Sequence, residues 1–490
     1  MPRHHDTALS RRSVLRAAGL AAGGLALGPR FRPAVAAVLT GRKSTDIRIR
    51  AVHHDFENHR FRTPLKFGGS RMDYLAVLNV TVRVERPDGQ SAEGFGSMPL
   101  GNVWSFPPRY VPPEQSLAAM KRFAEEVVRI ARDCDDTGHA LDLSRRMLPE
   151  QLQRARQVST EMNLAHPMPK LCSLVVISAL DAALHDAYGK VNGVNSYNAL
   201  GKEFVHHDLS HDLDERFKGK YLDAYTLREP KGTMPLYHLI GALDPLSDAD
   251  IKERLNDGLP ETLPEWIERD GLTHLKIKMN GDDLRWDVDR VLSIDRVTGE
   301  TQKRRGVQQW FYSIDFNERC PNVEYLLDFF ARIREKNPRA FERIQYVEQP
   351  TDRDLRAHPE NKMHAAAKIK PVVIDESLTD YESLLLAREQ GYSGAALKAC
   401  KGITEALLMA AGALEFKMFL TVQDLTCPGA SFLESAELSA RVPTVAAIEG
   451  NARQFCPDAN KEWEKKYPEL FIVKNGTVRT QGLTKPGLGH

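Results

Sequence analysis

The sequence predicts an α/β protein in which an α+β capping domain precedes a modified, TIM-like (β/α)8 barrel. Residues 45–201 contain two or three strands followed by helices, which is the order of an α+β domain. From Met234 onward strands and helices alternate, which indicates a parallel sheet with crossover helices. Seven candidate strands lie between residues 234 and 424. This number of residues per strand is close to that of a (β/α)8 barrel, which takes about 250 residues for its eight units.

The capping domain is expected over residues 45–201 because β-branched runs precede segments with helical apolar periodicity. Its predicted elements are strands over 46–52 and 74–85 and helices over 113–132 and 171–190. The polar stretch 202–233 is predicted to be a solvated insertion. Its His206, His207 and His211 leave a metal site as the alternative there.

The barrel is expected over residues 234–440, with residues 441–490 returning to the capping domain. An open, doubly wound sheet is the alternative, but no glycine-rich phosphate fingerprint follows the first strand. Helices are expected between the strands, as over 322–336 and 404–415. The candidate strands are Met234–Ala242, Leu272–Met279, Tyr312–Asn317, Ile344–Glu348, Val372–Asp375, Gly394–Ala399 and Phe419–Asp424.

The N-terminus resembles a twin-arginine export signal over residues 1–37. Arg11 and Arg12 precede an apolar run over 17–27, and small residues at 34–36 offer a cleavage site. The run is shorter than the ~20 apolar residues of a membrane span. We therefore expect a periplasmic or otherwise exported protein without a stable membrane span after cleavage. A short amphipathic helix and an uncleaved anchor are the alternatives.

Composition excludes several classes of protein. The 490 residues include 67 Lys and Arg and 66 Asp and Glu, so the net charge of +1 argues against a nucleic-acid partner. The 42% hydrophobic and 27% charged residues exclude a collagen, a disordered acidic chain and a polytopic membrane protein. The six cysteines contain no CxxC pair. We expect free buried thiols, and the spacing leaves any disulfide pairing open.

Two lysines share one face of the second predicted barrel strand. In Leu275-Lys276-Ile277-Lys278, alternation turns Lys276 and Lys278 into the barrel. Two neighbouring ammonium groups are expected to lower each other's pKa, which would make one of them a base near neutral pH. A solvated strand edge is the alternative for this pattern taken alone.

The next three predicted strands end in acids at Asp315, Glu348 and Asp375. Each acid taken singly fits a helix N-cap or an ion pair. Three convergent carboxylates repel one another, so a cation is expected between them. Their hard oxygen ligands suit Mg²⁺, and the lack of a histidine among them disfavours Zn²⁺. Asn317 shares a face with Asp315.

The sixth predicted strand carries a third inward lysine. Alternation places Lys398 inside with Ala396 and Cys400, and Lys401 follows on the other face or in the loop. Lys278 and Lys398 would then lie on strands two and six of eight. That spacing places them on opposite sides of the barrel mouth, with the metal between them.

This ordered set resembles the enolase superfamily, most closely its muconate-lactonizing and dipeptide-epimerase branch. The set is Lys-x-Lys, Asp-x-Asn, Glu-Gln-Pro, Asp-Glu-Ser and a late lysine, and the resemblance extends over about residues 46–490. The mandelate-racemase branch instead pairs a histidine with an aspartate on its last strands, and no histidine lies near residues 422–425.

The resemblance implies a role for each matched position. Asp315, Glu348 and Asp375 match the ligands of one Mg²⁺ per subunit. Lys278 matches the acid/base, Lys276 its electrostatic companion, and Lys398 the sixth-strand lysine, for which Lys401 is the alternative. The residues then expected to contact the ligands or the substrate are Asn317, Glu376, Lys401 and Asp424.

The implied activity is removal of the proton next to a carboxylate, through an ene-diolate that the metal stabilises. Racemisation, epimerisation or cycloisomerisation would follow, so the expected partner is a small carboxylate substrate. The alternatives are a sugar-acid dehydratase on the same site, a metal-dependent hydrolase, and a non-catalytic binder. A metal-dependent hydrolase on a barrel would require a His-x-His pair on the first barrel strand, and this strand contains a single histidine, His238. The oligomeric state, a homo-oligomer included, stays open.

Overall fold

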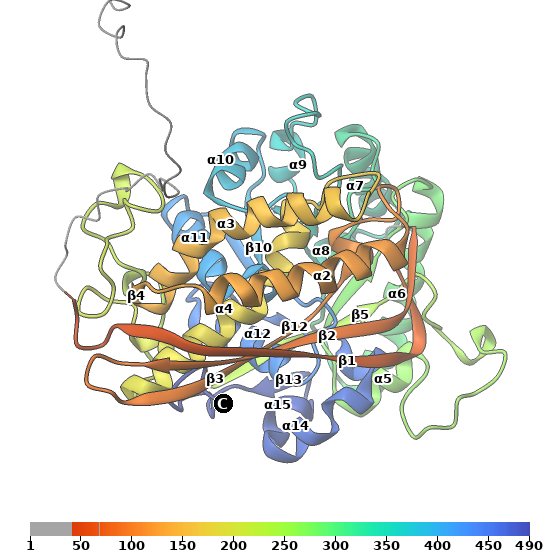
Figure 1. Cartoon of the computed structure of the whole chain (residues 1–490). Coiled ribbons are helices and arrows are strands. Elements are labelled where there is room, and N and C mark those ends of the chain that lie inside the picture. Colours follow the sequence, from red (N-terminus) through yellow and green to blue (C-terminus); the bar gives the residue numbers. More distant parts are fainter. Residues whose placement is uncertain (1–41, 68) are drawn as a thin grey trace, which may run out of the picture. The chain divides into compact units, whose positions relative to one another are not determined.

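The structure, a computed structural model, describes residues 42–67 and 69–490. The predicted export signal, with Arg11 and Arg12, lies outside the described residues. Within the described part, an antiparallel sheet with helices precedes a closed, eight-stranded parallel barrel (Figure 1). This architecture confirms the predicted fold class.

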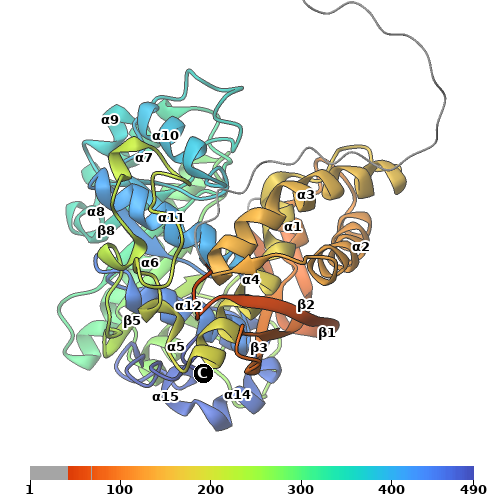
Figure 2. The same cartoon turned by 60° about the vertical axis from the view of Figure 1, so that its left-hand side comes forward.

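The capping domain is built on a four-stranded antiparallel sheet with the order β3-β2-β1-β4. Figure 2 shows its helices beside this sheet, away from the barrel helices α7 to α10. The elements are β1 (Ile47–Phe67), β2 (Ser70–Glu85), β3 (Ser91–Pro99), α1 (Asn102–Ser105), α2 (Pro113–Arg132), β4 (Thr137–Gly138), α3 (Ala140–Glu161) and α4 (Lys170–Asn192).

Helix α4 is the core of the capping domain and is buried on almost every side. Strand β3 lies against it so closely that a Cβ atom on Gly96 would fall 2.1 Å from the Ala179 carbonyl oxygen. Glycine at this position is therefore a packing requirement. Among the described residues, α4 alone has the length and apolar composition of a membrane-crossing helix, and its apolar stretch is fully buried inside the domain.

The barrel closes because its last strand pairs with its first, Ile448 opposite Leu236. The eighth strand lies beyond residue 440, so the predicted end of the barrel at that residue is too early. A two-residue strand offers no period for sequence analysis to detect. The strands are β5 (Thr233–Ile240), β6 (His274–Lys278), β7 (Phe311–Asp315), β8 (Ile344–Glu348), β9 (Val372–Ile374), β10 (Gly394–Leu397), β11 (Phe419–Val422) and β12 (Ile448–Glu449).

Helices alternate with the strands around the barrel. The crossover helices are α5 (Leu263–Asp270), α6 (Leu284–Arg305), α7 (Val323–Lys336), α8 (Pro338–Arg343), α9 (His364–Ala367), α10 (Tyr381–Glu389), α11 (Ile403–Glu415) and α12 (Ala430–Arg441). The chain then forms α13 (Ala452–Phe455), α14 (Lys461–Lys466), α15 (Pro468–Phe471) and β13 (Thr477–Arg479).

The C-terminal segment contacts both parts of the protein. Strand β13 pairs antiparallel with β5 of the barrel. Further on, the Leu488 amide donates to Asp186 Oδ1 of α4 at 3.0 Å, and the Ser196 amide donates to the Gly487 carbonyl at 2.8 Å. The segment therefore both completes the barrel and contacts the capping domain.

The polar insertion and the cysteines show no metal or disulfide chemistry in the described part of the chain. Residues 202–233 form turns and two short 3-10 helices, Glu215–Phe217 and Leu222–Ala224. His206 Nε2 lies 2.8 Å from Asp46 Oδ1, while the His207 and His211 rings stack at 4.4 Å. All six cysteines are free thiols, and five of them are buried, which confirms the prediction except for the half-buried Cys134.

Candidate active site

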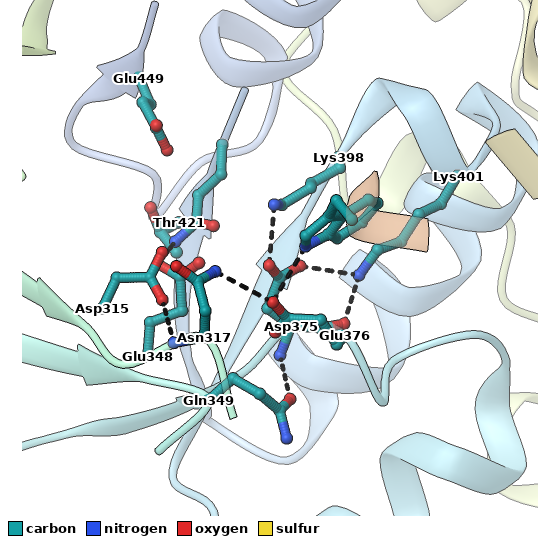
Figure 3. A network of polar contacts seen from close by, with 12 residues as sticks. Asp315, Asn317, Glu348, Gln349, Asp375, Glu376, Lys398, Lys401, Thr421 and Glu449 are labelled. Carbon is teal, nitrogen blue, oxygen red and sulfur yellow. Dashed lines mark hydrogen bonds and ion pairs between the residues drawn. The ribbon is translucent and has the colours of Figure 1, made fainter. Parts of the chain in front are cut away.

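The predicted site residues come together at the carboxyl ends of the barrel strands (Figure 3). Lys278 on β6 pairs in register with Asp315 on β7, and Asp315 pairs with Glu348 on β8. Asp375 directly follows β9. Parallel strands in register bring their last side chains to one level, so residues far apart in sequence share one buried site.

Lys276 lies deepest and is 1% exposed. Its Nζ is 2.8 Å from Glu348 Oε2, 2.9 Å from Glu449 Oε2 and 3.1 Å from Asp315 Oδ2. Burial lowers the pKa of Lys276, but the attraction of these carboxylates outweighs it and raises the pKa well above its usual value. The expectation of a lowered pKa is therefore wrong for Lys276, because three carboxylates lie within 3.1 Å of its Nζ. It acts as a fixed positive charge.

Lys278 lies one step nearer the mouth of the barrel. Its Nζ donates to Asp315 Oδ2 at 2.5 Å and to Asn317 Oδ1 at 3.1 Å. Asn317 has a left-handed backbone, with φ at 44°, and its amide donates to Asp315 Oδ1 at 2.8 Å. This turn aims both side chains at Lys278. Burial raises the pKa of Asp315, but Lys278 and Lys276 outweigh it, and the pKa lies well below its usual range.

The two late lysines occupy different positions beside Asp375 (Figure 3). Lys398 Nζ lies 2.8 Å from Asp375 Oδ2 and lines the central cavity together with Lys278. Lys401, in the 3-10 turn Ala399–Lys401, donates to the Asp375 carbonyl at 2.6 Å and to Asp375 Oδ1 at 3.1 Å, outside the cavity lining. Lys398 is therefore the sixth-strand lysine that faces Lys278, and Lys401 supports Asp375.

The central cavity lies between the barrel and the capping domain, and residues of both line it. Its charged lining consists of Lys276, Lys278, Lys398 and Glu449, together with Asp424. Its other walls are largely apolar: Leu65, Phe67, Met72 and Trp104 from the capping domain, and Leu239, Leu425, Thr426 and Asn451 from the barrel. Trp104 lines the cavity, whereas Phe106, two residues further on, is fully buried beside Tyr110.

Glu376 is a buried carboxyl group at the edge of the site. Its Oε1 accepts from Trp104 Nε1 at 2.9 Å and from Asn317 Nδ2 at 3.2 Å. Burial, together with repulsion by Asp375 and Glu318, raises the pKa of Glu376 to about 7. It therefore connects the capping domain to the residues around Asp375.

Asp424 lies in the cavity wall, but both of its carboxylate oxygens are engaged. Oδ1 accepts from the Cys427 amide and Oδ2 from the Asn451 amide, each at 2.7 Å. Burial and the nearby Glu449 raise the pKa of Asp424 to about 6. Asp424 thus joins the loops that follow β11 and β12, and its predicted contact with ligand or substrate stays a prediction.

Sequence reasoning missed two polar residues of the site. Glu449, on the two-residue strand β12, contacts Lys276, and Gln423, which follows β11, hydrogen-bonds Glu348 Oε2 and lies 3.4 Å from Lys276 Nζ. Recognition of an eighth barrel strand would have pointed to Glu449. His238 belongs to a different environment, because its Nδ1 lies 2.7 Å from an Arg453 guanidinium nitrogen and it does not line the central cavity.

The carboxylate set fits a hard divalent cation. Asp315, Glu348 and Asp375 offer only oxygen ligands, the donor set that Mg²⁺ prefers. Burial and repulsion by Asp315 and Asp375 raise the pKa of Glu348 well above its usual value, which indicates a site short of positive charge. Within residues 42–67 and 69–490, no three His, Cys, Asp or Glu side chains stand at ready metal-ligand spacing. Lys276, Lys278 and Lys398 each place Nζ within 2.8 Å of one of these carboxylates, and at Glu348 the lysine charges offset the repulsion only in part.

The fold and the site together define a class of protein. In this class, carboxylates and lysines at the carboxyl ends of the barrel strands form a buried site that a capping domain covers. The segment 259–490 matches the family model described as enolase C-terminal domain-like. Over residues 259–490, this match confirms the enolase-superfamily resemblance predicted from the sequence. Among curated protein sequences, none matches the chain significantly.

Solved structures with this fold include several superfamily enzymes. A muconate lactonizing enzyme from Pseudomonas fluorescens, complexed with muconolactone, is 17% identical with a TM-score of 0.55 over 90% of this chain and 96% of that one. A dipeptide epimerase from Enterococcus faecalis, complexed with Mg and L-Leu-L-Tyr, is 15% identical with a TM-score of 0.57 over 90% and 99%. An enolase from Bradyrhizobium with magnesium and mandelic acid is 16% identical with a TM-score of 0.56 over 90% and 95%. At these identities the likeness establishes the fold.

Proposed function

We propose that the protein is an isomerase or lyase that removes the proton next to the carboxylate of a small acid. Returning a proton to the same carbon on its other face racemises or epimerises the acid. In a lactone, loss of the α-proton with cleavage of the bond between the β-carbon and the ring oxygen gives an unsaturated acid and a free carboxylate. The reverse, in which the carboxylate adds to the double bond and the α-carbon takes up a proton, is a cycloisomerisation. The observation that supports this proposal most strongly is that Lys278 and Lys398 line one cavity from β6 and from the end of β10. Two lysines on opposite sides of one carbon could exchange its proton on either face.

Asp315, Glu348 and Asp375 would hold one Mg²⁺ per subunit. When bound, this ion supplies positive charge that stabilises a carboxylate whose neighbouring carbon has lost its proton. Lys276 adds a fixed positive charge beneath the site, because three carboxylates keep it protonated. Lys278 and Lys398 accept and donate the proton at Nζ, and the capping residues that line the cavity exclude water.

Proton exchange at the α-carbon tests this proposal. The mature protein is stripped with a chelator, returned to Mg²⁺, and incubated in heavy water with acid sugars, dipeptides and N-acylamino acids. We expect Mg²⁺-dependent loss of the α-proton NMR signal for at least one substrate class. Lys278→Ala should abolish turnover and leave the metal bound. Near-wild-type activity in that variant removes Lys278 from the mechanism, and the lack of any exchange contradicts the proposed reaction.

The proposal includes export, on the sequence pattern of residues 1–37. An exported enzyme would meet acids of environmental or cell-wall origin. Fractionation of cells that make the full chain tests this location, with R11K/R12K as the paired variant. We expect the native chain outside the cytoplasm and the variant retained inside. Equal distribution of the two chains contradicts a twin-arginine signal.

A further inference from the structure

Trp104 is a capping-domain residue that the barrel holds at three points. It lies in α1 and is 5% exposed. Its indole Nε1 donates to Glu376 Oε1 at 2.9 Å, and its carbonyl oxygen accepts from an Arg353 guanidinium nitrogen at 3.0 Å. The indole face lies over Lys398, with Nζ 4.4 Å from the ring centroid. Position, direction and tilt of the ring are therefore all constrained.

Arg353 is itself fixed by a buried ion pair. Its Nε donates to Glu318 Oε2 at 2.6 Å and its second guanidinium nitrogen to Glu318 Oε1 at 2.7 Å. Arg109 of the capping domain reaches the same carboxylate at 3.1 Å. A two-pronged arginine–carboxylate pair is the most directional ion pair available to a protein. The segment 104–109 is thus held against the barrel by Glu318 and Arg353.

Lys398 and Lys278 differ in how many oxygens hold them. Lys278 Nζ has two oxygen partners, on Asp315 and Asn317. In the described part of the chain, Lys398 Nζ has one carboxylate contact, Asp375 Oδ2 at 2.8 Å, and the face of Trp104. A cation over a buried indole face is stabilised by the ring quadrupole. Lys278 Nζ also has a capping-domain ring near it, but the Phe67 centroid lies farther away, at 5.6 Å. The indole is therefore the closer aromatic contact, and it stands beside a lysine that has fewer oxygen partners than Lys278.

We propose that Trp104 is a positioning residue whose indole face holds Lys398 Nζ at the cavity. The positioning stands on the contacts around Lys398 and does not depend on the reaction. Its catalytic consequence rests on the proposed function. Loss of the ring would then impair proton transfer on one face of the substrate carbon only.

Reductive dimethylation of lysines, measured by mass spectrometry without substrate, tests the positioning directly. W104L removes the ring face and the N–H, whereas W104F keeps a ring face and removes only the N–H. F106L is the matched control, because Phe106 is also buried in the same segment and packs on Tyr110. We expect W104L to raise Lys398 labelling at least fivefold, with Lys278 labelling within twofold of the native protein. W104F should fall between native and W104L, and F106L should match native.

Two labelling results would overturn the proposal. One is unchanged Lys398 labelling in W104L. The other is a parallel rise at Lys278 and Lys398, which would mean a general opening of the capping domain. A folded W104F protein with native labelling at both lysines would show that the N–H is dispensable and leave the ring face as the element tested by W104L.

Proton exchange from the two enantiomers of a substrate, followed separately, then tests the consequence. K398M and K278M identify which enantiomer each lysine deprotonates. We expect W104L to lower kcat about 10- to 30-fold for the enantiomer assigned to Lys398, within threefold for the other, and W104F to recover most of the loss. Equal losses for both enantiomers contradict positioning of Lys398. Labelling as expected with no exchange in the native protein would refute the proposed function and leave the positioning intact.

Discussion

Replacement of Lys398 or Lys401 by methionine separates the two late lysines, because methionine keeps most of the side-chain length and removes the charge. K398M deletes the ammonium group in the cavity, 2.8 Å from Asp375 Oδ2. General acid–base catalysis contributes about 10²- to 10⁴-fold, so kcat should fall by that factor for the face that Lys398 serves. The assay is α-proton exchange with saturating Mg²⁺.

K401M should act on stability more than on chemistry. Lys401 donates to the Asp375 carbonyl at 2.6 Å and to its carboxylate at 3.1 Å, and it is 5% exposed. Removing the donor leaves buried acceptors unpaired, which costs about 1–3 kcal/mol in the free energy of unfolding. We expect a lower urea midpoint and exchange within about tenfold of native. Abolished exchange in K401M beside near-native K398M would refute the assignment of Lys398.

Three further substitutions test other parts of the site and fold. E449Q removes the carboxylate of Glu449, which lies 2.9 Å from Lys276 Nζ, so kcat should fall while substrate affinity changes little. An unchanged kcat contradicts a role of Glu449 in holding the charge of Lys276. D424N leaves one backbone amide without its acceptor, so stability should fall by about 1–3 kcal/mol with kcat nearly kept; a lost kcat would make Asp424 catalytic. Burial, and after it the charge of Arg453, lowers the pKa of His238 well below 6.5. Below pH 6.5 this imidazole therefore takes up a proton in the unfolded chain but not in the folded one. The free energy of unfolding should fall by about 1.4 kcal/mol for each pH unit below 6.5. In H238N, urea unfolding between pH 5 and 7 should lose that slope; an unchanged slope contradicts a buried neutral imidazole.

Sequence reasoning succeeded where a regular period ran through several residues. The alternation around Lys276 and Lys278 and the strand-terminal acids predicted which side chains meet, because parallel strands in register leave no freedom in where their ends lie. Helix α2 was predicted with its observed bounds, 113–132, from apolar periodicity alone.

It failed where tertiary contacts replaced local pattern. Strand β1 continues to Phe67 through a polar stretch that has no strand signal of its own and is held by pairing with β2. Strand β12 has two residues, so Glu449 went unnoticed. The contact between Trp104 and Glu376 joins residues 272 positions apart, a distance that no local pattern spans. The raised pKa of Lys276 follows from carboxylates contributed by three other strands.

A crystal structure of the mature protein with Mn²⁺ in place of Mg²⁺, and with a small carboxylate substrate or product, tests the central claim most directly. The anomalous signal locates the ion without reference to any assumed ligand. The account predicts one ion per subunit bonded to oxygens of Asp315, Glu348 and Asp375, with Lys278 and Lys398 on opposite sides of the bound acid. An ion held elsewhere, or a site in which these three carboxylates bind no ion at saturating Mn²⁺, would contradict it.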